Sequence, residues 1–298
     1  MLRHVISPIT GSPACRTSDE DTAARIALAL AGVAGAPSVA DAIDSFGSAA
    51  KLVAAVHDRT DAAIPLTPLV RRRIRALATG VRVAVVLEES KRTNITAITP
   101  SHTSWPPQLC SMRGAAPLLL WVRGEANSLA MPSIALTGTR APTAYGVRMA
   151  IELATGLAGR GWALIAGAEG EIGQIVMRSA VAMNGKAIMV AASGLDRLPA
   201  PDDGVIYVSE LPPGFTSTFL SRRRAEHLVA ALGAKTIIVE AGVASSVMRT
   251  AEAAQAMKRP VGIVPGPAPT PFNSDPWELA QWHASGAVTS TLDADWLL

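Results

Sequence analysis

The sequence predicts an α/β fold, with a doubly wound, mostly parallel sheet preceded by a small helical domain. From about residue 134 onward, short apolar runs alternate with helical segments, which is typical of a parallel sheet covered by helices. Hydrophobic residues make up 49% of the 298 residues and charged residues 17%, so the chain can bury a sizeable core. For this length we expect about two domains. We place a flexible tail at 1–18, the helical domain at 19–80 and the sheet domain at 81–298.

Short helices separated by small residues are expected in the first domain. An acidic stretch at 19–21 favours the N-terminus of a helix that continues through Ala31. Further helices are expected at 38–45, at 48–57 and from Pro68 onward. The last of these carries the run Arg71–Arg75, which indicates either a nucleic-acid contact or only the solvated face of a helix.

In the second domain, apolar runs bounded by turn residues predict strands, and segments with one apolar face predict helices. The expected strands are 81–87, 94–98, 118–122, 134–137, 162–166, 187–191, 205–208, 236–240 and 261–264. The expected helices are 143–159, 171–184, 225–232 and 245–257. We expect the tail from Trp277 onward to form a helix, a short strand and a final capping helix.

The stretch 133–157 carries the clearest chemistry, because the strand 134–137 ends in a glycine turn that a helix follows. Backbone N–H groups at such a junction suit an anion, above all a phosphate. Gly138 permits close approach, Thr139 can donate its hydroxyl and Arg140 supplies a planar cationic fork. The alternative is that Gly138 only makes a turn and that Arg140 is only a solvated charge.

Other glycine turns follow other strands of the predicted sheet. They contain Gly167 and Gly170, then Gly194, and finally Pro265 and Gly266. Because the carboxyl ends of parallel strands share one edge of a sheet, these turns converge there. Together they predict a row of phosphate-sized anion sites along that edge.

Composition and charge limit the partners and the compartment. Residues 1–110 carry 12 basic against 9 acidic residues, whereas 111–298 carry 15 of each, so a nucleic-acid site would be a local patch. Neither the two cysteines nor the scattered histidines show ligand spacing, so we expect no metal. We find no secretory signal and no apolar run of membrane-spanning length, and we expect a cytoplasmic protein.

Several motifs together resemble the DNA-processing protein A (DprA/Smf) family. IALTGTRAPTAYG at 134–146, which includes Tyr145, is similar to the family's V-A-[IL]-V-G-[ST]-R-x-x-[ST]-x-Y-G. SELPPG at 209–214 matches S-E-x-P-P-G, and IVPGP at 263–267 resembles the family's V-P-G ending. FGSAAKLVAAV at 46–56 resembles, more faintly, an N-terminal helical domain of the SAM or helix-hairpin-helix kind.

The resemblance implies an extended Rossmann fold that binds single-stranded DNA and delivers it to a RecA-type recombinase. It further implies a homodimer formed through the sheet domain, with no catalysis and no cofactor. Arg140 is the leading candidate for a contact with a backbone phosphate. The other implied DNA-binding residues are Gly138, Thr139, Tyr145, Gly167, Gly170, Pro265 and Gly266.

The second glycine turn departs from the family pattern, S-G-x-A-x-G-I-D-x-x-A-H. Gly173 replaces the Asp and Met177 replaces the His. Glu169 and Glu171 bring negative charge to the place where a DNA backbone would pass. We interpret them as glutamates at a helix start rather than as acid–base catalysts, because no nucleophile or metal cluster accompanies them.

The family's F-x-x-R-N-R-x-I-A motif is also altered. Aligned on residues 228–232, it falls on residues 225–227, which are Ala, Glu and His. Three arginines lie just upstream and supply the positive charge of the motif from a shifted position: Arg222, Arg223 and Arg224. They form either a nucleic-acid patch or a solvated turn.

Two other classes of function compete with DNA binding. A sensor of a nucleotide-derived ligand is the alternative, because the acidic turn at 169–171 suits ribose hydroxyls better than a phosphate backbone. A nucleotide-cleaving phosphoribohydrolase would need P-G-G-x-G-T-x-x-E, and PGPAPTPFN at 265–273 lacks the Gly-Thr and the Glu.

Overall fold

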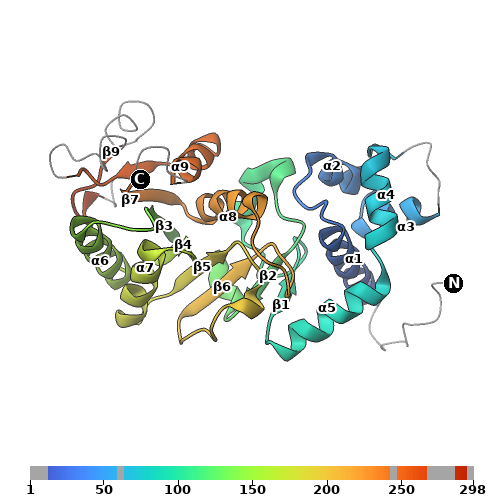
Figure 1. Ribbon diagram of the computed structural model, residues 1–298, viewed down its shortest axis with the longest axis horizontal. Helices are drawn as coiled ribbons and strands as arrows, with labels where there is room; N and C mark the ends of the chain where they lie inside the picture. The colour runs from blue at the N-terminus through green and yellow to red at the C-terminus, as the bar shows by residue number, and fades with distance from the viewer. Residues whose placement is uncertain (1–12, 59–63, 242–246, 267–285, 294–298) are drawn as a thin grey trace. The chain divides into compact units, whose positions relative to one another are not determined.

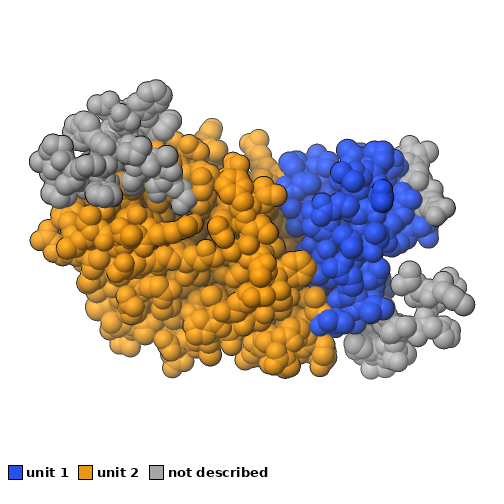
Figure 2. Space-filling view, in the orientation of Figure 1, with its two compact units in different colours: residues 1–85 blue, residues 86–298 orange. Residues whose placement is uncertain are grey.

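The computed structural model describes residues 13–58, 64–241, 247–266 and 286–293, and these divide into two compact units (Figure 2). The first unit comprises residues 1–85 and the second residues 86–298. None of the described helices is long and apolar enough to cross a membrane.

The first unit is helical. Its helices are α1 (Pro13–Leu30), α2 (Pro37–Phe46), α3 (Ala49–His57), α4 (Pro68–Leu77) and the start of α5 (Gly80–Arg92). Local signals fix the ends: Ser48 accepts a hydrogen bond from the Lys51 N–H at the start of α3, and Thr67 caps α4 in the same way. Helix α1 begins at Pro13, so residues 13–18 of the expected tail are helical, and the rest of that tail lies outside the described residues.

Asp21 on α1 joins two helices of this unit. Its Oδ1 accepts from the backbone N–H groups of Ala49 at 2.7 Å and Ala50 at 3.3 Å, so a side chain from α1 caps α3. Its other oxygen accepts from Nε of Arg25 at 2.7 Å. The carboxylate thus satisfies N-terminal donors of α3 and fixes α3 against α1.

The prediction of a strand at 81–87 is wrong, because these residues lie in α5. The run is apolar and rich in valine, a residue that is enriched in strands. In the helix, Val81 and Val85 are exposed, whereas Val83, Val86 and Ser90 are buried at helical spacing. The same valine-rich run therefore also has apolar residues at helical spacing, and it forms a helix.

The second unit is a mixed α/β fold with a mostly parallel sheet, as predicted (Figure 1). Its strands are β1 (Thr96–Ile98), β2 (Leu120–Arg123), β3 (Ser133–Gly138), β4 (Ala163–Gly167), β5 (Ala187–Ala191), β6 (Val205–Ser209), β7 (Lys235–Glu240), β8 (Val261–Ile263) and β9 (Gly286–Ala287). Their order is β1-β2-β6-β5-β4-β3-β7-β8-β9. The pairings of β1 with β2 and of β2 with β6 are antiparallel, and all the others are parallel.

Helices cover both faces of this sheet (Figure 1). Helices α6 (Ala144–Gly159) and α7 (Glu171–Ala182) pack together on one face, and α8 (Phe219–Leu232) and α9 (Val247–Ala256) pack together on the other. Short 3-10 helices η2 (Pro107–Ala115), η3 (Ala126–Ala130) and η4 (Leu195–Arg197) lie in the connections. The strand expected in the tail is β9, whereas the helices expected on either side of it lie outside the described residues.

Arg259 fixes the C-terminal end of α8. Its Nη1 donates to the carbonyl oxygens of Ala230, Ala231 and Gly233, where the helix leaves acceptors without partners. Its Nη2 donates at 2.8 Å to the Gln108 carbonyl in η2. Burial lowers the pKa of the Arg259 guanidinium. A single cation therefore holds α8 against η2, and α8 forms one wall of the site described below.

We expect Asp21→Ala to reduce the stability of the first unit by about 1–3 kcal/mol, because it removes the cap of α3 and the partner of Arg25. The unit contains no Trp or Tyr, so unfolding in urea should be followed by circular dichroism. Asp41→Ala, at an exposed position of α2, is the matched control. Equal unfolding midpoints for the two variants would contradict the role of Asp21.

Candidate nucleic-acid interface

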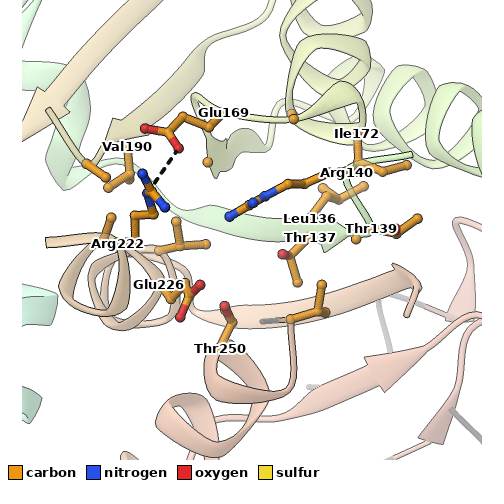
Figure 3. Close-up of a pocket in the computed structure, with 18 residues that line it drawn as sticks. Leu136, Thr137, Thr139, Arg140, Glu169, Ile172, Val190, Arg222, Glu226 and Thr250 are labelled. Carbon is orange, nitrogen blue, oxygen red and sulfur yellow. Dashed lines mark ion pairs between the residues drawn. The ribbon is translucent and has the colours of Figure 1, made fainter. Parts of the chain in front are cut away.

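A cleft opens at the carboxyl ends of β3, β4 and β5, between the start of α7 and helix α8 (Figure 3). Its volume is about 90 Å³. Among the predicted site residues, Gly138, Thr139, Arg140, Gly167, Gly170 and Arg222 line it. Glu169, Glu226, Thr137 and Thr250 also line it. The turns after β3 and β4, which the sequence placed on one edge of the sheet, therefore meet there, whereas Gly194, Pro265 and Gly266 of the other predicted turns do not line the cleft.

The N-terminus of α6 already holds an anion that belongs to the protein. Glu240, at the end of β7, is buried, and its carboxylate accepts from the backbone N–H of Thr143 at 3.1 Å. The Thr143 hydroxyl donates to the same carboxylate at 3.0 Å and accepts from the Gly146 N–H at 3.2 Å. This junction was expected to offer its N–H groups to a phosphate, and Glu240 takes that place instead.

At the β3–α6 turn, Arg140 remains available to an external anion. Its side chain is exposed and reaches into the cleft (Figure 3). Within the described part of the chain, the Arg140 guanidinium has no ion-pair or hydrogen-bond partner. The neighbouring Thr139 is fixed by its own N–H, which donates to the Glu240 carbonyl at 2.8 Å.

Glycines at the second turn allow α7 to approach this arginine. Gly170 has a φ of +106°, and a Cβ there would lie 3.5 Å from Cγ of Arg140. At Gly173 a Cβ would lie 2.0 Å from the carbonyl oxygen of Gly167, so no side chain fits. Where the family pattern has Asp, this chain has Gly173, and the close backbone contact at this position permits only glycine.

The arginine triplet lies within a helix and not in a turn, because α8 begins at Phe219, earlier than predicted. Thr218 and Ser221 form a reciprocal capping box that sets this start. Arg222 faces the cleft, where its Nε lies 4.0 Å from a carboxylate oxygen of Glu169. The exposed guanidinium of Arg223 lies over the Phe219 ring, 5.9 Å from its centroid.

Arg224 does not line the cleft, and its contacts join parts of the fold. It forms an ion pair with Glu210, and its Nη2 donates to the carbonyl of Ala115 at 3.4 Å. Both side chains of the pair are largely buried, with exposed fractions of 25% and 11%. Removing Arg224 would leave Glu210 without this partner in a largely buried position.

Tyr145, Pro265 and Gly266 do not line the cleft. The Tyr145 hydroxyl donates to the Pro265 carbonyl at 2.7 Å and so joins α6 to the segment after β8. The guanidinium of Arg148 lies 5.4 Å from the centroid of the Tyr145 ring. These contacts give Tyr145 a role in fixing the edge of the sheet.

Sequence reasoning missed the pair formed by Glu226 and Arg249. Nε of Arg249 donates to Glu226 at 2.6 Å and Nη2 donates at 3.0 Å, which joins α9 to α8. No local spacing reveals a pair between two helices. The exposed Phe219 was also missed, although counting the F-x-x-R-N-R pattern from Phe219 places its arginines on Arg222 and Arg224.

His227 lies on α8 beside the arginines. Burial lowers its pKa, and the charges of Arg223 and Arg224 lower it further. The described residues contain no group of three or more His, Cys, Asp or Glu side chains that could hold a metal ion.

Comparisons with known proteins identify the family to which this arrangement belongs. The family model described as DNA recombination-mediator protein A matches residues 96–293. A DNA processing protein DprA of Mycobacterium tuberculosis is 36% identical over 238 residues, covering 71% of this chain and 60% of that protein. Protein Smf of Escherichia coli is 30% identical over 198 residues, covering 63% of this chain and 52% of that protein. The chain therefore spans less than two thirds of the length of these relatives.

Solved structures share the fold. DNA processing protein A of Streptococcus pneumoniae matches with a TM-score of 0.74 at 20% identity, covering 90% of this chain and 95% of that one. DNA processing protein A of Helicobacter pylori, which is described by its single-stranded DNA binding mode, matches with a TM-score of 0.58 at 23% identity. That match covers 68% of this chain and 95% of the other.

We expect Gly146→Ala to destabilise the second unit by about 2–4 kcal/mol, because overpacking adds to the loss of a buried hydrogen bond. Its Cβ would lie 1.8 Å from Oε2 of Glu240, which must then leave Thr143. All 6 Trp residues belong to this unit, so Trp fluorescence during urea unfolding measures its stability. Gly80 lies in the first unit, and a Cβ there would meet nothing within 4 Å, so Gly80→Ala should leave the stability of the second unit unchanged. Equal stability of the two variants would contradict the contact.

The lowered pKa of His227 predicts that stability falls as the pH falls. Below about pH 6.5 the unfolded chain takes up a proton that the folded imidazole resists, so the His227 contribution is complete above that pH and is lost below it. His227→Gln should therefore lose less stability between pH 7.5 and pH 5.5 than the parent protein, as measured by urea unfolding. Identical losses would show that His227 does not titrate in this way.

Proposed function

Since the chain belongs to the DNA recombination-mediator protein A family, we propose that it binds single-stranded DNA by the phosphate backbone at this cleft. It does so without catalysing a reaction. One observation carries this proposal: the Arg140 guanidinium reaches into the cleft without a partner among the described residues. A guanidinium fork is the side-chain group best matched to the oxygens of a phosphate.

The form of the cleft supports a backbone contact rather than a base pocket. Gly138, Thr139, Gly167 and Gly170 expose main chain and a hydroxyl beside Arg140. Contacts of this kind position a strand and carry no sequence information by themselves. Binding should therefore be tolerant of sequence and strongly dependent on salt. Arg223 and Phe219, both exposed at the start of α8, extend the surface along which the strand would run.

The size of the cleft does not favour the alternative, a sensor of a nucleotide-derived ligand. Pockets that enclose small ligands have volumes of roughly 300–1,000 Å³. The cleft measures about 90 Å³, which suits a phosphate-sized group and not a whole nucleotide. The family model is described as a DNA recombination mediator and the Mycobacterium tuberculosis relative as a DNA processing protein, which also supports a DNA strand as the ligand.

We extend the proposal to the setting in which the chain acts. It delivers the bound strand to a RecA-type recombinase, forms a homodimer through the sheet unit and works in the cytoplasm. Membership of the family supports these steps. The absence of catalysis is supported by the described lining of the cleft, where no Ser, Cys or His accompanies the carboxylates.

We expect Arg140→Ala to weaken binding of a labelled poly-dT oligonucleotide about tenfold at low salt, because one charge-assisted phosphate contact is lost. The slope of log K against log salt should become shallower by about 0.7, the value for one phosphate of a single strand. Fluorescence anisotropy at several salt concentrations measures both quantities.

Arg178→Ala is the matched control, because Arg178 is exposed on α7 and lies outside the cleft. It removes the same charge from the same unit. If the two variants lost affinity equally, net charge would explain the effect and Arg140 would not be a phosphate contact. Unchanged affinity of a folded Arg140→Ala variant would also reject this role.

A further inference from the structure

Carboxylates neutralise several of the cations around the cleft. On α8 and α9, Arg222 pairs with Glu169, Arg224 with Glu210 and Arg249 with Glu226. Each such pair balances the charge of its arginine, and of these three arginines Arg222 lines the cleft. The three ion pairs differ in distance and burial, however. These differences determine in which pair a phosphate could displace the carboxylate.

The pair of Arg224 with Glu210 is tight, and both side chains are largely buried. The pair of Arg249 with Glu226 is also close, at 2.6 Å and 3.0 Å, and it joins two helices. Opening either pair would leave a charge in a partly buried place, which is costly. These two pairs therefore belong to the fold.

The pair of Arg222 with Glu169 is different. Its atoms lie 4.0 Å apart, and its side chains are 44% and 45% exposed. An exposed pair at this distance contributes little to stability, because water screens both charges. It can open at little cost to the fold.

Its position makes this loose pair important for the site. Glu169 lies on the turn before α7 and Arg222 lies on α8, so the pair crosses the cleft from one wall to the other (Figure 3). The guanidinium of Arg140 reaches toward the same space (Figure 3). A phosphate placed between Arg140 and Arg222 would meet the Glu169 carboxylate as a like charge.

We propose that Glu169 sets the affinity of this site by competing with the DNA phosphate for Arg222. This inference rests on the proposed function. While Glu169 holds Arg222, Arg140 is the unpaired guanidinium among the described residues lining the cleft. When a strand binds, either Arg222 leaves Glu169 for the phosphate or the phosphate is held by Arg140 alone. In both cases the carboxylate weakens binding.

The test replaces Glu169 by its neutral isostere. Glu169→Gln should bind poly-dT about threefold to tenfold more tightly than the parent protein at low salt, because it frees one cation and removes a like charge. Its salt slope should be steeper by about 0.7, because one more phosphate is neutralised. Fluorescence anisotropy gives both values, and thermal unfolding checks that the variant is folded.

Glu171→Gln is the matched control for net charge. Glu171 is exposed two positions along the same segment and does not line the cleft. Arg222→Ala, alone and combined with Glu169→Gln, tests the partner. The gain should disappear in the double variant, because the freed guanidinium is gone.

Each outcome decides the proposal. A gain confined to Glu169→Gln and dependent on Arg222 supports it. Equal gains for Glu169→Gln and Glu171→Gln, or a gain that persists without Arg222, would overturn it in favour of a general charge effect. Unchanged binding in Glu169→Gln would overturn it while leaving DNA binding intact. If neither the parent protein nor any variant bound single strands at low salt, the proposed function itself would fail, and this inference with it.

Discussion

The buried Glu240 carboxylate determines where this fold can take a ligand. In a doubly wound sheet, ligands bind where the winding changes direction, beyond the carboxyl ends of the strands. Here that point lies between β3 and β7, since β3 pairs with both β4 and β7. Glu240 reaches from β7 to the N-terminus of α6, and Gly146 leaves room for it. A negative side chain already occupies the place at which a phosphate would profit most from the helix dipole.

The available cleft is consequently displaced along the sheet edge, to the ends of β3, β4 and β5. Its second wall is α8, whose position depends on two cations that are themselves not in the cleft. Arg259 holds the C-terminal carbonyls of α8 against η2, and Arg224 ties its first turns to Glu210. With both ends of the helix fixed, Arg222 is presented to the cleft at a defined place. Structural and ligand-facing arginines are therefore neighbours in the sequence but separate in function.

The sequence was sufficient for the sheet, because buried parallel strands are continuous apolar runs that few other elements imitate. Strand β5 falls on the predicted 187–191, and the glycine turns after β3 and β4 do meet at one edge. The same reasoning failed for α5, because its valines fit both the spacing of a strand and the spacing of a helix. The burial of Val83 and Val86 shows that the helical spacing applies. It also could not find the partner of Arg222 or of Arg249, because these pairs join elements that only tertiary packing brings together. The hydrogen bonds of Glu240, which ends the predicted strand 236–240, could not be predicted for the same reason: their partner, Thr143, lies 97 residues away in the chain.

The balance of charge in the second unit gives these pairs their importance. Residues 86–298 carry 17 basic and 17 acidic residues, so no general positive field draws a nucleic acid to the surface of this unit. Attraction must come from cations that are locally unpaired, and the strength of each depends on how firmly a carboxylate holds it. A tight pair such as Arg224 with Glu210 stabilises the fold and adds almost nothing for a ligand. A loose, exposed pair such as Arg222 with Glu169 stabilises the fold little and can be opened by a competing anion. In a unit with equal numbers of basic and acidic residues, affinity for a phosphate backbone is therefore set by the carboxylates as much as by the arginines.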